Sequence, residues 1–416
     1  MLFYNLVIFL YWCGVHIASL FNEKARKWVS GRKNIFSTIK KTLQEKNIKS
    51  NVIWFHCASL GEFEQGRPVI EALKKSNPTV KTVLTFFSPS GYEIRKDYEY
   101  ADAVFYLPLD FKSNAKQFIK LINPKAVAFI KYEFWLNYLA ELKKQNIPTY
   151  LISAVFRPEQ HFFKWYGYLF FNALSTYKKI FLQDKNSFQL LKEKGFNHIE
   201  IVGDTRFDRV FEISKTKTDL SIIDGFCGKH KILIAGSTWS KDEEFIIAVY
   251  KKLKEKHTDL KLMIAPHEVN KSSVARIENL IGENKYSLYT NPKNIETSDI
   301  LLIDTIGILS QLYRYGTAAY IGGGFNDGIH NISEALVYNI PVVFGTNHHK
   351  FIEASETLQL GLSKEIKNEG DLFLFLDKII ADENYRKQLS EEIKKYMQGK
   401  SGATTKILSE LNSILA

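Results

Sequence analysis

Cysteine is scarce in this chain, and the common signatures of metal-binding and phosphate-loop proteins are absent. The 416 residues contain three cysteines, Cys13, Cys57 and Cys227, whose spacing gives neither a paired metal motif nor a disulfide framework. No HExxH pair and no Walker-type lysine loop occurs, so the sequence gives no support to a zinc protease or a P-loop nucleotidase. We therefore expect a protein of a reducing compartment that uses neither a metal ion nor a cofactor.

Internal repeats and low-complexity tracts are also absent. A hydrophobic content of 45% with 24% charged residues is typical of a folded chain, and the length suits two domains of middling size. The formal net charge of +11 indicates an acidic partner, which can be nucleic acid, an anionic membrane or a phosphorylated substrate. No recognisable nucleic-acid-binding module is present, so we expect no nucleic acid among the partners.

Charged side chains are missing from Leu2 to Asn22, and this apolar run is about as long as a bilayer-spanning helix requires. Its central aromatic residues leave an interfacial helix in one leaflet open as an alternative. Nine lysines and arginines follow between residues 23 and 49, against only Glu23 and Glu45. Basic residues beside an apolar segment stay cytoplasmic and attract anionic head groups. We expect a membrane anchor over residues 1–22 with the rest of the chain in the cytoplasm; the alternative is a solvated basic helix without a membrane role.

Beyond residue 50, short apolar runs alternate with helical patterns, which predicts βα units and mostly parallel sheets. The expected strands of the first half are Val52–His56, Lys81–Phe87, Ala103–Tyr106, Ala126–Ile130 and Thr149–Ile152. Those of the second half are Lys231–Ala235, Lys261–Ala265, Ile300–Ile303, Ala318–Ile321 and Val342–Phe344.

A polar stretch over residues 209–229 separates the two series and is interpreted as a linker. The sequence therefore predicts an α/β protein with Rossmann-like domains at 23–208 and 230–416, the last helix being a candidate for packing back on the first domain. Two such domains predict a cleft between them, with ligands at the carboxyl ends of the strands.

The most distinctive segment runs from Ile321 to Ala335 and reads I-G-G-G-F-N-D-G-I-H-N-I-S-E-A. Glycines after a predicted buried strand let the backbone approach a ligand closely, and the N–H groups that open the next helix favour an anion. Glu334 is placed to reach sugar hydroxyls beside a bound phosphate. The alternative is a tight strand-to-helix turn, but the added H-N-x-x-E favours a nucleotide site.

Polar loops follow other strands as well. In H-C-A-S-L-G-E-F, His56–Phe63, a carboxylate stands at a helix start, where Glu62 is either a cap or a general base for an acceptor hydroxyl. Glu133 follows a later strand, and Arg157 could pair with a phosphate or carboxylate. In the second half, Ser237 and Thr238 suit either helix capping or phosphate binding.

In their order along the chain, ten motifs resemble those of the bacterial 3-deoxy-D-manno-oct-2-ulosonic acid (Kdo) transferases of lipopolysaccharide synthesis. They are S-L-G-E, S-P-S-G, Y-L-P-L-D, K-Y-E-F-W-x-N, G-D-T-R-F-D, G-S-T-W, A-P-H, D-T-x-G-x-L, G-G-G-F-N-D-G-I-H-N-x-x-E-A and P-V-V-F-G, and they cover nearly the whole chain. The resemblance implies a GT-B glycosyltransferase fold, with two Rossmann-like domains facing a cleft and an N-terminal membrane-anchor helix. It also implies metal-free, inverting transfer of Kdo from CMP-Kdo to a lipid A precursor (lipid IVA) at the cytoplasmic face of the inner membrane.

By position, the resemblance makes Glu62 the catalytic base and Glu133 a second functional glutamate. The donor-binding residues would be Ser237, Thr238, Pro266, His267, Gly322, Gly323, Gly324, His330, Asn331 and Glu334, the last of them on the ribose. The acceptor-binding residues would be Ser59, Gly61 and Arg157.

Two positions depart from the family pattern. Where the family has Pro-Arg-His, this chain has Ala265, Pro266 and His267, so a phosphate-binding arginine is missing; and Ile308 stands where a glutamate is expected. Either Lys271 or Arg206 takes over the arginine's role, or donor binding differs in detail.

Two other functions fit parts of the pattern. One is a GT-B enzyme that uses a UDP-sugar and a lipid acceptor, which competition between CMP and UDP would separate. The other is a non-catalytic, membrane-tethered nucleotide-sugar binder. Glu62 argues against the binder, since a protein that only binds needs no base.

Overall fold

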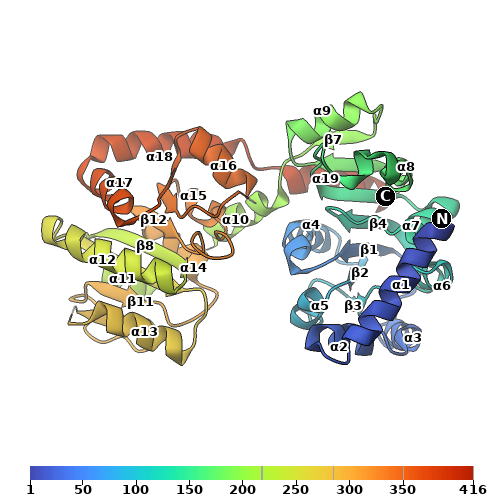
Figure 1. The fold of residues 1–416 in the computed structure, drawn as a ribbon, viewed down its shortest axis with the longest axis horizontal. Coiled ribbons are helices and arrows are strands. Elements are labelled where there is room, and N and C mark those ends of the chain that lie inside the picture. Colours follow the sequence, from blue (N-terminus) through green and yellow to red (C-terminus); the bar gives the residue numbers. More distant parts are fainter. Residues whose placement is uncertain (217–218, 284, 350, 416) are drawn as a thin grey trace. The chain divides into compact units, whose positions relative to one another are not determined.

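The computed structural model describes residues 1–216, 219–283, 285–349 and 351–415. Contacts divide the chain into two compact units (Figure 1). Unit 1 comprises Met1–Asp208 together with the C-terminal segment from Ser401, and unit 2 comprises Arg209–Lys400. Each unit is built around one parallel sheet of seven strands.

The sheet of unit 1 has the strand order β3-β2-β1-β4-β5-β6-β7. Its strands are β1 (Val52–Cys57), β2 (Lys81–Phe86), β3 (Ala103–Tyr106), β4 (Pro124–Ile130), β5 (Thr149–Ala154), β6 (Lys179–Leu182) and β7 (Ile199–Ile201). Every residue of the central strand β1 is buried. Successive side chains point to opposite faces, so Trp54 joins the core on one face while Phe55 joins the core on the other. Burial on both faces explains the nearly continuous apolar run of this strand.

The helices of unit 1 cover both faces of this sheet. They are α1 (Leu2–Ala18), α2 (Glu23–Ser30), α3 (Ile35–Glu45), α4 (Leu60–Ser76), α5 (Pro89–Arg95), α6 (Lys112–Ile122), α7 (Leu136–Lys144), α8 (Tyr168–Ala173), α9 (Lys185–Glu193), the start of α10 (Thr205–Lys215) and α19 (Ala403–Leu415). Helix α19 contacts α4 and β4, and its Ile407 and Leu411 are fully buried in their core. Asp208 accepts hydrogen bonds from the N–H groups of Gly402 and Thr404 at the start of α19, both at 2.6 Å.

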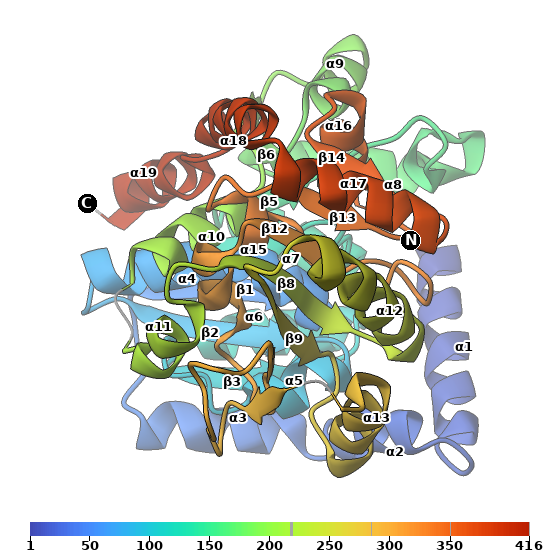
Figure 2. The same cartoon turned by 90° about the vertical axis from the view of Figure 1, so that its left-hand side faces the viewer.

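Unit 2 has the strand order β10-β11-β9-β8-β12-β13-β14. Its strands are β8 (Lys231–Thr238), β9 (Leu260–Pro266), β10 (Tyr286–Leu288), β11 (Ile300–Leu302), β12 (Ala318–Ile321), β13 (Val342–Phe344) and β14 (Ser363–Glu365). Its helices include α11 (Ser221–Cys227), α12 (Ser240–Lys256), α13 (Lys271–Ile281), α14 (Leu309–Leu312), α15 (Ser333–Leu336), α16 (Ile352–Gln359), α17 (Glu369–Ala381) and α18 (Glu383–Gln398). Helix α12 packs on β8 and β9 (Figure 2).

The stretch predicted to be a linker, residues 209–229, is largely helical instead. Helix α10 runs through the boundary between the units, and α11 follows within unit 2. Ile223 and Phe226, three residues apart on α11, are fully buried. This apolar stripe is short and surrounded by polar residues, which explains why the sequence pattern indicated a linker. Residues 217 and 218 of the predicted linker lie outside the described residues.

Helix α1 packs along one face against the rest of unit 1. Tyr4 and Ile8 are buried, and the hydroxyl of Tyr4 donates to Asp110 Oδ2 at 2.6 Å. Most of its other large apolar side chains are exposed, among them Leu2, Phe3, Leu6, Phe9 and Leu10. In the part of the chain that the structure describes, no helix combines the length and the apolar character that crossing a membrane would need.

Candidate functional site

Glu62 lies in the first turn of α4, directly after the carboxyl end of β1. Ser59 is the N-cap of this helix: its Oγ accepts a hydrogen bond from the N–H of Gly61 at 3.2 Å and donates one to Glu62 Oε2. A carboxylate in the first turn is stabilised by the helix dipole. Glu62 remains partly accessible, so its carboxylate caps the helix and can still meet a ligand.

Glu133 lies in the loop between β4 and α7 and is almost fully buried, with 7% of the residue exposed. Its Oε2 accepts a hydrogen bond from Trp135 Nε1 at 2.6 Å and lies 3.1 Å from His56 Nε2. The backbone carbonyl of Glu133 accepts a hydrogen bond from the Tyr177 hydroxyl at 2.6 Å. These contacts fix both the side chain and the loop that carries it.

His56 belongs to this site and was not predicted as a site residue. It is fully buried on β1, and its Nδ1 lies 2.8 Å from Thr85 Oγ1. Trp135 Nε1 can only donate a hydrogen bond, so it is the donor to Glu133. His56 Nε2 is a second donor to the same carboxylate only in the tautomer that carries a proton on Nε2. The position of a histidine at the end of a strand was visible in the sequence, but the pairing of β1 with β4, which brings His56 to Glu133, was not.

Glu62 and Glu133 both influence the thiol of Cys57, the last residue of β1. Burial raises the pKa of the Cys57 thiol well above its ordinary value, and the carboxylates of Glu62 and Glu133 raise it further. A thiol in this state is protonated at neutral pH, so Cys57 is not a nucleophile. The two carboxylates therefore lie near the same end of β1.

Arg157 lies on the same edge of the sheet, just past β5, and its side chain is exposed. Burial raises the pKa of Tyr132, whereas Arg157 lowers it and Glu62 raises it. The charges of Arg157 and Glu62 therefore shift the pKa of Tyr132 in opposite directions. Since β1, β4 and β5 are consecutive in the sheet, all five residues predicted for catalysis and acceptor binding in unit 1 follow the carboxyl ends of neighbouring strands.

In unit 2, the glycine-rich loop after β12 crosses very close to the end of β8. A Cβ atom at Gly322 would lie 2.2 Å from the backbone oxygen of Ser237, so no larger residue fits without a backbone shift. Gly323 has φ +90°, which disfavours any L side chain. Thr238 is buried beside them, while Gly324 is packed against the backbone of Gly345. The predicted donor residues of β8 and β12 are thus neighbours.

Asp242 on α12 holds this loop and was not predicted. It is buried, and it accepts hydrogen bonds from the N–H groups of Gly323 and Trp239, both at 2.9 Å, and from the Tyr320 hydroxyl at 2.6 Å. In the sequence, Asp242 was visible only as an acidic residue near the start of a predicted helix. Its bond to a glycine 81 positions further along depends on the tertiary structure.

Three rings stack beside the loop. His267, which follows Pro266 at the end of β9, lies 4.6 Å from the Trp239 ring and 4.4 Å from the His330 ring, centroid to centroid. Burial, together with the neighbouring His267, lowers the pKa of His330 to about 4. His330 is therefore neutral at pH 7, and its Nε2 lies 3.4 Å from the donor Nε1 of Trp239.

Asn331 and Glu334 lie at the short helix α15. Asn331 Oδ1 accepts a hydrogen bond from the N–H of Ser333 at 3.0 Å, and its Nδ2 lies 3.5 Å from Glu334 Oε1. Glu334 is partly buried. Its carboxylate contributes to raising the pKa values of Tyr313 and Tyr338, whose main cause is burial.

Lys271 and Arg206, the two candidates to replace the missing phosphate-binding arginine, belong to different units. Arg206 belongs to unit 1 and forms an ion pair with Asp204, with Nη2 at 2.6 Å from Oδ2. Lys271 opens α13 and is exposed. Arg276, which the sequence did not single out, binds the fully buried Glu243 through Nε and Nη2, and Thr238 Oγ1 lies 3.4 Å from the same carboxylate. Arg276 is therefore linked to the predicted phosphate-binding turn through Glu243.

Among the residues that the structure describes, no group of histidine, cysteine, aspartate and glutamate side chains is arranged to hold a metal ion. The polar groups at both sites are instead carboxylates, hydroxyls, backbone N–H groups and stacked rings. Such groups can accept a proton from a hydroxyl and stabilise a phosphate.

Residues 32–209 match the model of the family described as 3-deoxy-D-manno-octulosonic-acid transferase (kdotransferase). The chain is 28% identical to the 3-deoxy-D-manno-octulosonic acid transferase of Aquifex aeolicus, covering 83% of this chain and 91% of that protein. It is 26% identical to the transferase of the same name from Rickettsia felis, covering 87% of this chain and 77% of that protein.

A solved structure, the UDP-GlcNAc 2-epimerase of Neisseria meningitidis bound to UDP-GlcNAc, superimposes with a TM-score of 0.61 over 87% of this chain and 100% of that chain. At 16% identity this likeness shows the fold alone. The fold and the matches together define an α/β glycosyltransferase. Within that class, the chain is similar to the 3-deoxy-D-manno-octulosonic acid transferases over most of its length.

Proposed function

We propose that this protein is an inverting glycosyltransferase that moves Kdo from CMP-Kdo to a lipid A precursor during synthesis of the lipopolysaccharide core. The observation that carries the proposal is the accessible carboxylate of Glu62, held at a helix start at the same end of the sheet as Glu133 and Arg157, in a chain similar to these transferases. A carboxylate in that position suits a reaction in which a hydroxyl must be deprotonated.

In the proposed reaction, Glu62 takes the proton of the acceptor hydroxyl as its oxygen attacks the anomeric carbon of Kdo. The bond from that carbon to the phosphate oxygen breaks, CMP leaves with the bonding electron pair, and the configuration inverts. Glu133, buried against His56 and Trp135, contributes a fixed negative charge near the attacking hydroxyl. Arg157 is exposed and can pair with an anionic group of the acceptor.

Unit 2 would bind the donor. The hydroxyls of Ser237 and Thr238 and the backbone of the glycine-rich loop suit the phosphate, because small residues allow N–H groups to approach it closely. Glu334 is assigned to the ribose hydroxyls. In this proposal the two units correspond to the acceptor and donor domains of a GT-B glycosyltransferase.

We also propose that the protein binds the cytoplasmic face of the inner membrane through α1. The exposed apolar side chains of α1 and the basic residues that follow it support this assignment. An anionic lipid acceptor would be found at that surface.

Mass spectrometry of the reaction products tests the transfer. The purified protein is incubated with CMP-Kdo generated in situ and a tetra-acylated lipid A precursor. A mass gain of one or more Kdo residues supports the proposal and counts the additions. No gain, with the protein folded and the donor present, would contradict it; competition of CMP and UDP for the protein would then show whether a uridine nucleotide is preferred.

A further inference from the structure

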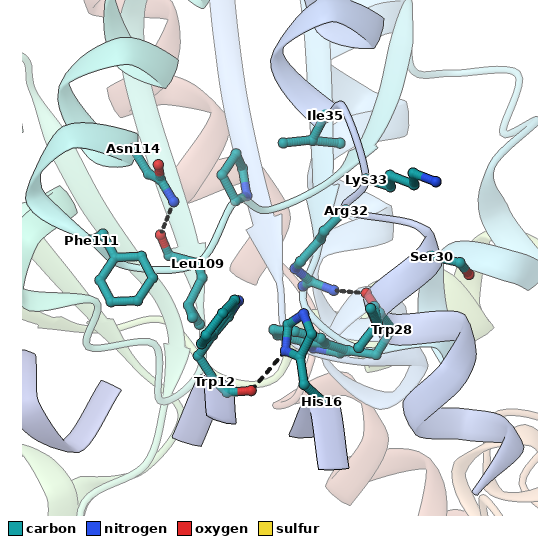
Figure 3. A pocket seen from close by; sticks show the side chains of 12 residues that line it. Trp12, His16, Trp28, Ser30, Arg32, Lys33, Ile35, Leu109, Phe111 and Asn114 are labelled. Carbon is teal, nitrogen blue, oxygen red and sulfur yellow. Dashed lines mark hydrogen bonds between the residues drawn. The ribbon is translucent and has the colours of Figure 1, made fainter. Parts of the chain in front are cut away.

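A cavity of about 280 Å³ lies in unit 1, beside the loops that follow the carboxyl ends of β2 and β3. Trp12 and His16 on α1 line one side, Trp28, Arg32 and Lys33 line another, and the loop before α6 completes it (Figure 3). We refer to this cavity as the Arg32 pocket. None of the lining residues that the structure describes is acidic.

Arg32 is a cation without a counter-charge in its surroundings. Its Nε, Nη1 and Nη2 donate to the backbone oxygens of Leu107, Trp28 and Phe87 at 2.9, 3.2 and 2.8 Å. Its guanidinium lies over three aromatic rings, the nearest being Trp28 at 3.9 Å. No carboxylate of the described chain lies within ion-pair distance, and burial lowers the pKa of Arg32 to about 9. Arg32 is only partly exposed, and charges shielded from water are normally paired, so a bound anion would supply the counter-charge that this site lacks.

A second observation also indicates an oxygen ligand. Trp28 is 5% exposed, and its Nε1 donor is buried without a hydrogen-bond acceptor in the described structure. Buried donors of this kind are rarely left without a partner. On the opposite side, His16 Nδ1 lies 2.8 Å from the backbone oxygen of Trp12, so this nitrogen carries the proton and the ring is held in place. Lys33 adds a second positive charge at the mouth of the cavity.

The surroundings of the Arg32 pocket are apolar. Helix α1, which supplies Trp12 and His16, also exposes Leu6, Phe9 and Leu10, each about half exposed or more. A soluble anion would gain nothing from these side chains, whereas the acyl chains of an amphiphile would bury them. We propose that the Arg32 pocket binds the phosphate head group of a lipid whose acyl chains lie along the exposed apolar side chains of α1.

Binding of short-chain lipids to the full-length protein, followed by tryptophan fluorescence, tests this inference without any Kdo transfer. The probes are dihexanoyl phosphatidic acid, dihexanoyl phosphatidylcholine and inorganic phosphate, all below micelle-forming concentrations. Lys33→Glu is the test variant, because Lys33 is exposed and its replacement should not unfold the protein. Lys40→Glu is the matched control, since it is an exposed lysine on α3 that does not line the pocket and makes the same change in net charge.

We expect phosphatidic acid to bind, and Lys33→Glu to weaken that binding about tenfold while Lys40→Glu leaves it nearly unchanged. Equal binding of inorganic phosphate would overturn the lipid assignment and leave a simple anion site. Equal binding of phosphatidylcholine would overturn the role of charge, because that head group is neutral overall. Absence of binding, or equal effects of the two variants, would overturn the proposal, whereas the transfer reaction is judged separately by its own mass-spectrometric assay.

Discussion

At the scale of single residues, the two glutamates of unit 1 have different surroundings. Glu62 is partly accessible and held by Ser59, whereas Glu133 is buried, accepts a hydrogen bond from Trp135 and lies 3.1 Å from His56 Nε2. A proton acceptor must reach the substrate, which favours Glu62 as the base. A buried, fully bonded carboxylate is better suited to holding charge and position.

Replacing Glu62 by Gln should lower the rate of transfer by about 10²- to 10⁴-fold, the usual contribution of a general base. Binding of CMP-Kdo should persist, because Glu62 and the predicted donor residues belong to different units. Glu64→Gln is the control, since Glu64 lies two residues further along the same helix and pairs with Arg95. Initial rates and donor binding by calorimetry check the prediction, and wild-type turnover by the Gln variant would rule out the base role.

The stability of unit 2 should depend on the protonation of His330. The pKa of His330 is about 4 in the folded protein and near 6.5 when unfolded, so between these values the unfolded chain binds more protons. The contribution of this residue to stability is therefore fully present above about pH 6.5 and is lost as the pH falls toward 4. Urea unfolding at pH 7 and pH 5 should show a smaller loss for His330→Gln than for the wild type. Equal losses would show that another group governs the acid sensitivity.

At the scale of elements, the sequence pattern predicted most of the strands, including the edge strand β3, but missed the interior strand β6. Ala103–Tyr106, Ala318–Ile321 and Val342–Phe344 are confirmed with their predicted bounds, and the other predicted strands differ by one to three residues at an end. Four strands were missed: β6, β7, β10 and β14. Three of these form edges of the sheets, where strands are short and need no continuous apolar run, as in Ser363–Glu365.

Close packing between elements should make the glycine-rich loop sensitive to a single methyl group. In Gly322→Ala the new Cβ would meet the backbone of Ser237 at 2.2 Å, so β8 or the loop must shift, at a cost of about 1–3 kcal/mol. Gly225→Ala on α11 is the control, because its Cβ would have only one neighbour, at 3.8 Å. Calorimetry of CMP binding should show a large loss for the first variant only. Equal affinities would mean that the loop does not contact the nucleotide.

At the scale of the whole molecule, the net charge of +11 and the exposed side chains of α1 suggest attachment to an anionic surface. Binding to vesicles that contain anionic lipid should weaken with added salt, since exposed charges are screened beyond about 10 Å at 0.1 M ionic strength. Leu6→Asp and Phe9→Asp should lower vesicle binding by about tenfold or more without unfolding the protein, because both side chains are exposed.

Leu374→Asp is the matched control for this experiment, since Leu374 is an exposed leucine of α17 in unit 2. Sedimentation with vesicles measures binding, and circular dichroism checks the fold. Vesicle binding that is unchanged in the α1 variants, or lowered equally by the control, would contradict a membrane role for α1.

The sequence by itself determined the alternation of strands and helices, the parallel sheets and the motifs at the strand ends, because these depend on local periodicity and on the residues within one loop. Only the tertiary structure decided that His56 meets Glu133, that Asp242 holds Gly323, and that α19 completes the core of unit 1. Each of these contacts joins residues far apart in the chain. Their formation depends on strand order and side-chain packing, which no local pattern encodes.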